Sequence, residues 1–175
     1  ENVWPRGWPQ LRRHMEAYYA ACAELGATLV SLMEEALDAP RGFFDALYRE
    51  HISTLRVLRY PPVPPAQAAA EQLSCSEHTD SGLLTLLYQD ATGGLQVRNG
   101  AGRWVDVPPL GGSMVINIGD TMERLSHGRW RATMHRVRAN RSPDSRFSVP
   151  FFYEPRWDAR IGCLCQPHTA ACQPP

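Results

Sequence analysis

The sequence predicts an α+β domain in which a long helix precedes an antiparallel β-sandwich or jelly roll. Apolar residues recur at helical spacing between about residues 10 and 37. After residue 50, short apolar segments alternate with turns rich in Gly and Pro. The chain has 175 residues, which is enough to bury one core of its own. We therefore expect one structural domain that contains both parts.

A continuous apolar stripe predicts the long helix. Its members recur in steps of four and three: Leu11, Met15, Tyr18, Cys22, Leu25, Leu29, Leu32 and Ala36. The stripe has heptad spacing, so a coiled-coil partner is an alternative. Because the e and g positions show no orderly charge pairing, we expect the helix to pack against the protein's own sheet. Asp38-Ala39-Pro40 predicts the cap and first turn of a short second helix to about Arg49, within a helical region at 1–52.

The strand region is predicted at 53–155, and an irregular, truncated tail at 156–175. Asn99-Gly100-Ala101-Gly102 between two apolar segments indicates a hairpin, whereas Ala66 to Ser74 resembles a loop and 119–133 has no clear form. The predicted strands are 54–60, 83–88, 95–98, 103–107, 113–118, 135–138 and 146–152.

Charge and cysteine content narrow the partners and the compartment. Eighteen basic and eighteen acidic residues cancel, which argues against binding to nucleic acid or a membrane surface. Five scattered cysteines do not suggest a disulfide framework, so we expect a reducing, cytoplasmic compartment. We also expect a monomer. One cluster could hold zinc, but its spacing matches no zinc pattern, so free thiols in an irregular tail are expected: Cys163, Cys165, His168 and Cys172.

His78 and Asp80 form the first candidate site. Residues two apart on an extended segment point to the same side, so both side chains can face one point. An imidazole and a carboxylate are two of the three ligands that hold non-haem Fe(II). The third is His127 or His135, and we favour His135 because it opens a short strand that would hold it rigidly.

Arg146 and Ser148 form the second candidate site. Strand alternation places both on one face, where a guanidinium fork beside a hydroxyl can receive a carboxylate. An edge-strand arginine paired with a nearby acid is the alternative.

Taken together, the chain resembles the isopenicillin N synthase-like family of Fe(II) and 2-oxoglutarate-dependent oxygenases. The resemblance rests on motifs that occur in order: Leu58-Arg59-Tyr60-Pro61, His78-Thr79-Asp80-Ser81-Gly82, Leu84-Thr85-Leu86-Leu87, Gly94-Leu95-Gln96-Val97, Asn117-Ile118-Gly119-Asp120, Ser126-His127-Gly128-Arg129, His135-Arg136-Val137 and Arg146-Phe147-Ser148.

The resemblance implies a double-stranded β-helix with Fe(II) held by His78, Asp80 and His135. It also implies that Arg146 and Ser148 bind the distal carboxylate of 2-oxoglutarate, with Tyr60 as a further contact. Such an enzyme would use O2 to oxidise a small organic substrate by hydroxylation, desaturation or cyclisation, releasing succinate and CO2. Family members carry further N- and C-terminal parts, so a fragment or reduced form is expected, and His127 replaces the asparagine common at that place.

Three rival functions stay open at this point. An Fe(II) oxidase of the same fold would use Arg146 and Ser148 on a substrate carboxylate instead of 2-oxoglutarate. An inactive metal-binding jelly roll could use the long helix as a docking surface for a partner. A zinc hydrolase would leave Arg146 and Ser148 without a role.

Overall fold

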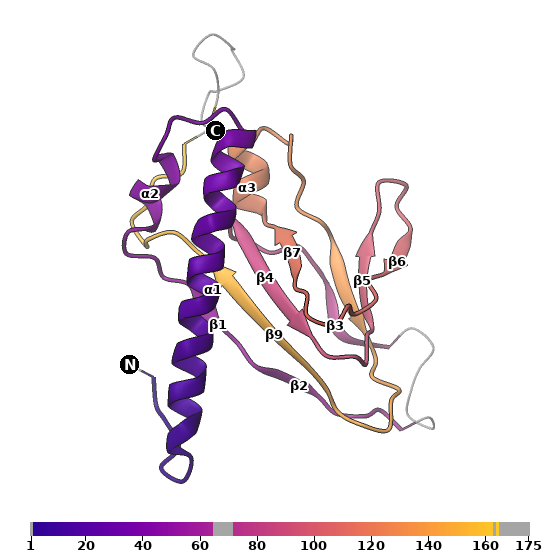
Figure 1. Cartoon of the computed structure of the whole chain (residues 1–175). Helices are drawn as coiled ribbons and strands as arrows, with labels where there is room; N and C mark the ends of the chain where they lie inside the picture. The colour runs from indigo at the N-terminus through magenta and orange to yellow at the C-terminus, as the bar shows by residue number, and fades with distance from the viewer. Residues whose placement is uncertain (1, 65–71, 163, 165–175) are drawn as a thin grey trace.

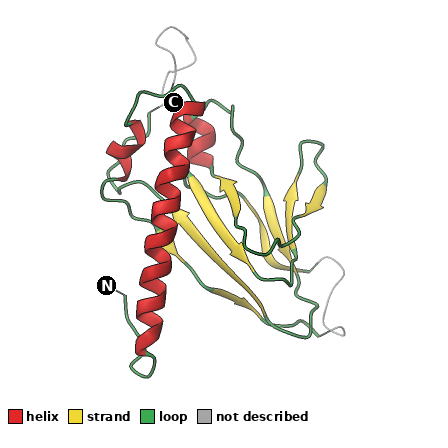
Figure 2. Cartoon of the chain, in the orientation of Figure 1, coloured by secondary structure: helices red, strands yellow, loops and turns green. Residues whose placement is uncertain are grey.

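The computed structural model describes residues 2–64, 72–162 and 164. Two antiparallel sheets face each other, and the long first helix crosses the outside of one of them (Figures 1 and 2). The elements are α1 Pro9–Ala36, α2 Phe43–Tyr48, β1 Thr54–Leu55, β2 Leu58–Tyr60, β3 Leu73–His78, β4 Leu84–Gln89, β5 Leu95–Arg98, β6 Trp104–Asp106, β7 Val115–Ile118, α3 Asp120–Leu125, β8 His135–Arg138 and β9 Arg146–Tyr153.

The strand order identifies the topology. One sheet runs β1-β9-β4-β7, with β2 also paired to β9, and the other runs β3-β8-β5-β6. Consecutive strands therefore mostly lie in different sheets, and the chain winds between them in antiparallel pairs. This arrangement is a double-stranded β-helix, a form of jelly roll, so the predicted fold class is confirmed.

The main core lies between α1 and the outer face of the five-stranded sheet. Outward side chains of β4 and β9 are fully or almost fully buried there: Leu84, Leu86, Phe151 and Tyr153. The alternate residues of the same strands point between the two sheets and line an interior cavity. One face of the five-stranded sheet thus packs in the main core, and the other face forms one wall of the cavity.

The predicted stripe on α1 is partly wrong. Leu25 and Leu32 are 40% and 59% exposed, whereas the buried residues of the helix are Cys22, Gly26 and Val30. Gly26 lies directly over the Tyr153 ring, and a Cβ at this position would be 2.9 Å from Tyr153 Cγ. The helix therefore contacts the sheet closely at a glycine, and a pattern of large apolar residues does not predict such a contact.

The second helix begins later than predicted. Gly42, in the left-handed region at φ 77°, precedes α2, and Asp38 adopts φ 54° instead of capping a helix. The cap comes from α1, because the Glu34 carboxylate accepts hydrogen bonds from the Gly42 and Phe44 backbone N–H groups at 2.7 and 3.1 Å. A cap supplied from another helix leaves no local sequence signal.

Two strand assignments also differ from the prediction. The expected strand at 54–60 is divided into β1 and β2 around Arg56, which donates its backbone N–H to Pro150 of β9. Pro150 has no N–H to return, so the ladder is interrupted at this point. Residues Leu73 and Ser74, expected in a loop, begin β3, and α3 lies in the region that had no assigned form.

The cysteine expectations are tested only in part. Cys22 and Cys75 are free thiols. The tail cluster of Cys163, Cys165, His168 and Cys172 lies outside the described residues. Among the helices that the structure describes, none is long and apolar enough to span a membrane.

Candidate metal and carboxylate site

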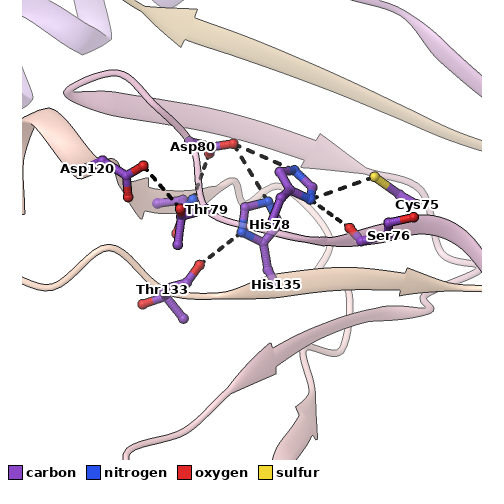
Figure 3. A network of polar contacts seen from close by, with 9 residues as sticks. Cys75, Ser76, His78, Thr79, Asp80, Asp120, Thr133 and His135 are labelled. Atoms are coloured by element: carbon purple, nitrogen blue, oxygen red, sulfur yellow. Dashed lines mark hydrogen bonds and ion pairs between the residues drawn. The ribbon is translucent and has the colours of Figure 1, made fainter.

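The last residue of β3 and the first of β8 bring two imidazoles together. His78 and His135 are register partners across the antiparallel pair, and their ring centroids lie 4.2 Å apart. Asp80 follows β3 directly, and its Oδ1 atom lies 3.9 Å from His78 Nε2 and 3.7 Å from His135 Nε2 (Figure 3). One donor atom from each residue lies within 4.8 Å of the others, so these three side chains could hold a metal ion.

Hydrogen bonds fix which nitrogen each histidine presents. His78 Nδ1 lies 2.8 Å from the Ser76 carbonyl oxygen, and His135 Nδ1 lies 3.0 Å from the Thr133 carbonyl oxygen (Figure 3). Because a carbonyl oxygen can only accept, both Nδ1 atoms carry the proton and both Nε2 atoms are free lone-pair donors. This arrangement is typical of metal-ligating histidines in proteins.

Asp80 is held by a neighbouring strand. It is 7% exposed, and the Asn117 amide on β7 donates to its Oδ2 atom at 2.7 Å. That bond leaves Oδ1 directed at the two imidazoles. Asn117 belongs to one of the motifs that carry the family resemblance, but its role was not predicted. A polar residue inside the apolar segment Val115–Ile118 was the available signal.

The two candidates for the third ligand are separated by the fold. His135 belongs to the metal-ligating group, whereas His127 follows α3 in a turn with φ 54°. Within the described part of the chain, the group that could hold a metal contains His135 and does not contain His127. The geometry therefore supports the choice of His135.

A cavity of about 140 Å³ extends from these three residues between the sheets. Apolar residues form much of its wall, including Leu87, Leu95, Val97, Val115 and Val137. Its polar lining contains the metal group and the predicted carboxylate receptor, namely His78, Asp80, His135, Tyr60, Arg146 and Ser148. All six predicted site residues thus lie around one cavity.

Arg146 is buried in the wall of this cavity at 2% exposure. Its Nε donates to the Gly93 carbonyl oxygen at 2.6 Å and its Nη2 to Gln89 Oε1 at 3.3 Å. The Tyr60 ring stacks near it, with 5.0 Å between the ring centroid and the guanidinium carbon. Burial lowers the pKa of Arg146, an effect that Tyr60 and Asp90 oppose.

One nitrogen of the Arg146 guanidinium makes no hydrogen bond to the described residues. Nη1 is buried and has no hydrogen-bond partner in the described structure. Ser148, which is 2% exposed, lies two residues along the same strand and lines the same cavity. Leaving a buried donor of a charged group unpaired is costly, so this nitrogen fits an anionic ligand such as a carboxylate. The alternative of an edge-strand arginine paired with an acid does not describe Arg146, whose bonds to described residues go to neutral acceptors from a central strand.

A second cavity, of about 320 Å³, lies beyond Arg146 and is bordered by Gly93, Arg136, Arg138 and Asn140. It is larger, but none of the three metal-ligating residues lines it. Arg136 and Arg138 are already paired with Glu77 and Asp106. The cavity that contains the metal group is therefore the candidate site.

Comparison with known proteins agrees with this site. The sequence profile of the 2OG-Fe(II) oxygenase superfamily matches residues 52–155. A 2-oxoglutarate-Fe(II) type oxidoreductase of Aspergillus fumigatus is 39% identical over 168 residues, which cover 93% of this chain and 49% of the fungal protein. Homoarginine-6-hydroxylase 2-ODD-C23.1 of Arabidopsis thaliana is 37% identical over 163 residues, covering 91% of this chain and 49% of the plant protein.

Solved structures of similar proteins have the same fold. A full-length Neurospora crassa protein, crystallised in complex with alpha-KG, superposes with a TM-score of 0.86 at 28% identity, covering 93% of this chain and 53% of that one. The chain thus spans about half the length of the curated relatives that it matches. The predicted family is confirmed: with a jelly-roll core, a two-histidine, one-carboxylate group and a matching profile over more than half of its length, the chain belongs to the 2OG-Fe(II) oxygenase superfamily.

Proposed function

We propose that this chain forms the core of a non-haem Fe(II) and 2-oxoglutarate-dependent dioxygenase that oxidises a small organic molecule. His78, Asp80 and His135 would hold the iron, and Arg146, Ser148 and Tyr60 would bind 2-oxoglutarate. One observation carries the proposal: the metal-ligating group and Arg146, which has an unpaired buried nitrogen, line the same cavity.

The ligand set suits this reaction class. Two imidazoles and one carboxylate occupy one face of an octahedral metal and leave the other positions open to ligands. Iron and 2-oxoglutarate, when bound, supply the oxidising chemistry with O2 and yield succinate and CO2. The chain's own contribution is to hold three donors rigidly, through Ser76, Thr133 and Asn117.

The rest of the cavity would position the cosubstrate. Arg146 Nη1 and the Ser148 hydroxyl can both donate to one carboxylate at the inner end. The apolar wall formed by Leu95, Val97 and Val115 suits a short carbon chain and keeps water away from it. None of these residues has to transfer a proton as a general acid or base.

The rival Fe(II) oxidase would place its own substrate's carboxylate on Arg146. The relatives favour 2-oxoglutarate, since several are named 2-oxoglutarate-dependent and the Neurospora crassa protein was solved with alpha-KG bound. The other small molecules named with these relatives range from homoarginine to thymine. The substrate of this chain must therefore be inferred from its own residues.

We also propose a cytoplasmic monomer, as the balanced charge and free thiols suggest. Sedimentation equilibrium would test the monomer, and fractionation of the source cells would test the compartment. A stable dimer or an extracytoplasmic protein would contradict this proposal.

The central experiment separates cosubstrate binding from turnover. Fe(II) and 2-oxoglutarate are added without oxygen, and the weak visible charge-transfer band of the chelate is recorded. Oxygen is then admitted and succinate is measured. Folded protein that gives neither band nor succinate would disprove the proposed function. Folded protein that binds Fe(II) but gives no band with 2-oxoglutarate would favour the oxidase.

Matched variants assign the residues. His135→Ala should abolish the band, whereas His127→Ala should retain it; the reverse result would show that the ligand assignment is wrong. Arg146→Lys retains a charge but loses the planar fork, so we expect weaker 2-oxoglutarate binding with iron binding preserved. Arg59→Lys is the control, since Arg59 is exposed on β2 and bonds Ser145 outside the cavity.

A further inference from the structure

A second guanidinium in the cavity has no acidic partner. Arg56 lines the same cavity as Arg146, as do Leu58 and Tyr60, the alternate residues that follow it. Its guanidinium carbon lies 5.4 Å from the Phe152 ring centroid. Arg56 is exposed, and its side chain has no hydrogen bond or ion pair with any described residue. It stacks on Phe152 at the cavity wall.

An unpaired carboxylate lies two residues beyond Phe152. Glu154 follows β9 directly, in step with Ser148 and Phe152, and lies just beyond the strand residues that line the cavity. Its backbone bonds Ser53, but its carboxylate has no hydrogen bond or ion pair with any described residue. The ionisable groups that interact with it are Asp80 and Tyr48, and neither is a cation.

A glycine leaves room for this carboxylate. Gly82 lies two residues beyond Asp80, and a Cβ on it would collide with the Glu154 carboxylate. The Glu154 side chain is therefore directed toward the segment that carries the metal ligand Asp80, and it is not directed into solvent away from the site.

The two charges suit opposite ends of one small molecule. Residues 152 and 154 are about 7 Å apart along an extended strand, and the Arg56 guanidinium carbon stacks 5.4 Å from the Phe152 ring centroid. Among the described residues no ion pair joins Arg56 to Glu154, so each is available to a ligand. An anion on Arg56 and a cation on Glu154 would lie several ångströms apart, too far for adjacent groups on one carbon.

We propose that Arg56, Phe152 and Glu154 form the substrate site, and that it selects a small zwitterion with a carboxylate at one end and an ammonium or guanidinium at the other. Arg56 binds the carboxylate, Glu154 binds the cation, and the carbon chain between them packs on Phe152. This inference rests on the proposed function, because it assigns Arg146 to the cosubstrate and leaves Arg56 for the substrate.

Titration calorimetry with defined probes tests the site. The protein is loaded with Fe(II) and saturating 2-oxoglutarate without oxygen, and its charge-transfer band confirms loading. The probes are L-lysine, L-arginine and 6-aminohexanoate, called double-charged because each has a carboxylate and a distal cation; L-lysine and L-arginine also carry an α-ammonium. Hexanoate and hexylamine are analogues that carry one charge each. We expect at least one double-charged probe to bind about tenfold or more tightly than both single-charge analogues.

Two variants distinguish the two ends. Glu154→Gln should weaken binding of the best double-charged probe about tenfold, and so should Arg56→Gln. Glu154→Gln should no longer distinguish that probe from hexanoate, whereas Arg56→Gln should no longer distinguish it from hexylamine. The controls are Glu50→Gln and Arg59→Gln, which alter exposed residues outside the cavity and should leave all five affinities unchanged.

The outcomes do not overlap with those of the proposed function. Loaded protein that binds none of the three double-charged probes would overturn the substrate site while leaving the dioxygenase proposal intact. Equal loss of affinity for all probes in both variants would also overturn it, because that pattern indicates a general structural effect. Protein that never forms the charge-transfer band would instead count against the dioxygenase proposal.

Discussion

At the scale of single residues, Asn117 fixes the orientation of Asp80, a proposed metal ligand. Its amide donates a hydrogen bond to the carboxylate, at 2.7 Å from Oδ2. Without it, Asp80 could rotate away from the two imidazoles. We expect Asn117→Ala to weaken metal binding about 10- to 100-fold, although all three ligands remain. Calorimetric titration with Co(II) would measure this change, with Asn99→Ala in the β5–β6 hairpin as control. Unchanged affinity would show that the orientation of Asp80 does not depend on Asn117.

A second single-residue effect concerns acid stability at the turn after β4. The Asp90 carboxylate accepts the Thr92 N–H on Oδ1 at 2.9 Å and the Phe147 N–H on Oδ2 at 2.5 Å. Burial alone would raise the pKa of Asp90, but these backbone bonds outweigh it and lower the pKa. Its stabilisation is therefore complete above the unfolded-state pKa, near 3.9, and is lost as the pH falls through the lower folded-state value.

Asp90→Asn tests that assignment, because an amide can accept only one of the two bonds. We expect the free energy of unfolding at pH 7 to fall by about 1 kcal/mol, and the difference from the unsubstituted protein to shrink below about pH 4. Urea denaturation at several pH values would measure it, with Asp144→Asn as the control. A difference that stays constant down to about pH 2 would contradict the role of the charge.

At the scale of elements, Gly26 sets the distance between α1 and the sheet. Alanine would favour the isolated helix by about 1 kcal/mol, but its Cβ would press on a Tyr153 ring that Tyr48 holds from the other side at 4.2 Å. Overpacking of this kind costs about 1–3 kcal/mol. We expect Gly26→Ala to lower the melting temperature, whereas Ser31→Ala on the exposed side should not. A higher melting temperature for Gly26→Ala would show that the ring can move.

The elements also show what the sequence could predict. The bounds of β5 and β8 were predicted correctly, because alternating β-prone residues between turn residues leave few other arrangements. β3 was not among the predicted strands, because Leu73–His78 is mostly small and polar, and its pairing with β8 is long-range and irregular. The predicted contact face of α1 differs from the observed one, because α1 contacts the Tyr153 ring through a glycine.

The candidate site was predicted more completely than the fold around it. His78, Asp80, His135, Arg146 and Ser148 stand in short motifs with strand alternation, so local spacing already indicates their shared direction. Arg56, Asn117 and Glu154 were not predicted to act in the site. Their roles depend on which strands become neighbours, and only the assembled jelly roll supplies that information.

At the scale of the whole molecule, the site joins the two sheets. The proposed metal ligands belong to β3, β8 and the segment after β3, whereas Arg146 and Ser148 belong to β9 of the five-stranded sheet. A metal alone would be held from the four-stranded side, and 2-oxoglutarate bound to that metal would reach the other sheet. Metal and 2-oxoglutarate bound together should therefore stabilise the fold by more than the sum of their separate effects.

Thermal unfolding tests this coupling with Mn(II), which takes the same kind of ligands as Fe(II) without rapid oxidation in air. At about 100 times each dissociation constant, a ligand specific for the folded state adds about 2.7 kcal/mol, which is about 5–11 °C for a chain of this size. We expect 2-oxoglutarate to give this shift only when Mn(II) is present, and to give little of it in Asp80→Ala or Arg146→Lys. Arg59→Lys should retain the full shift. An equal shift from 2-oxoglutarate without metal would mean that the two ligands bind independently, and that the cavity does not couple the sheets.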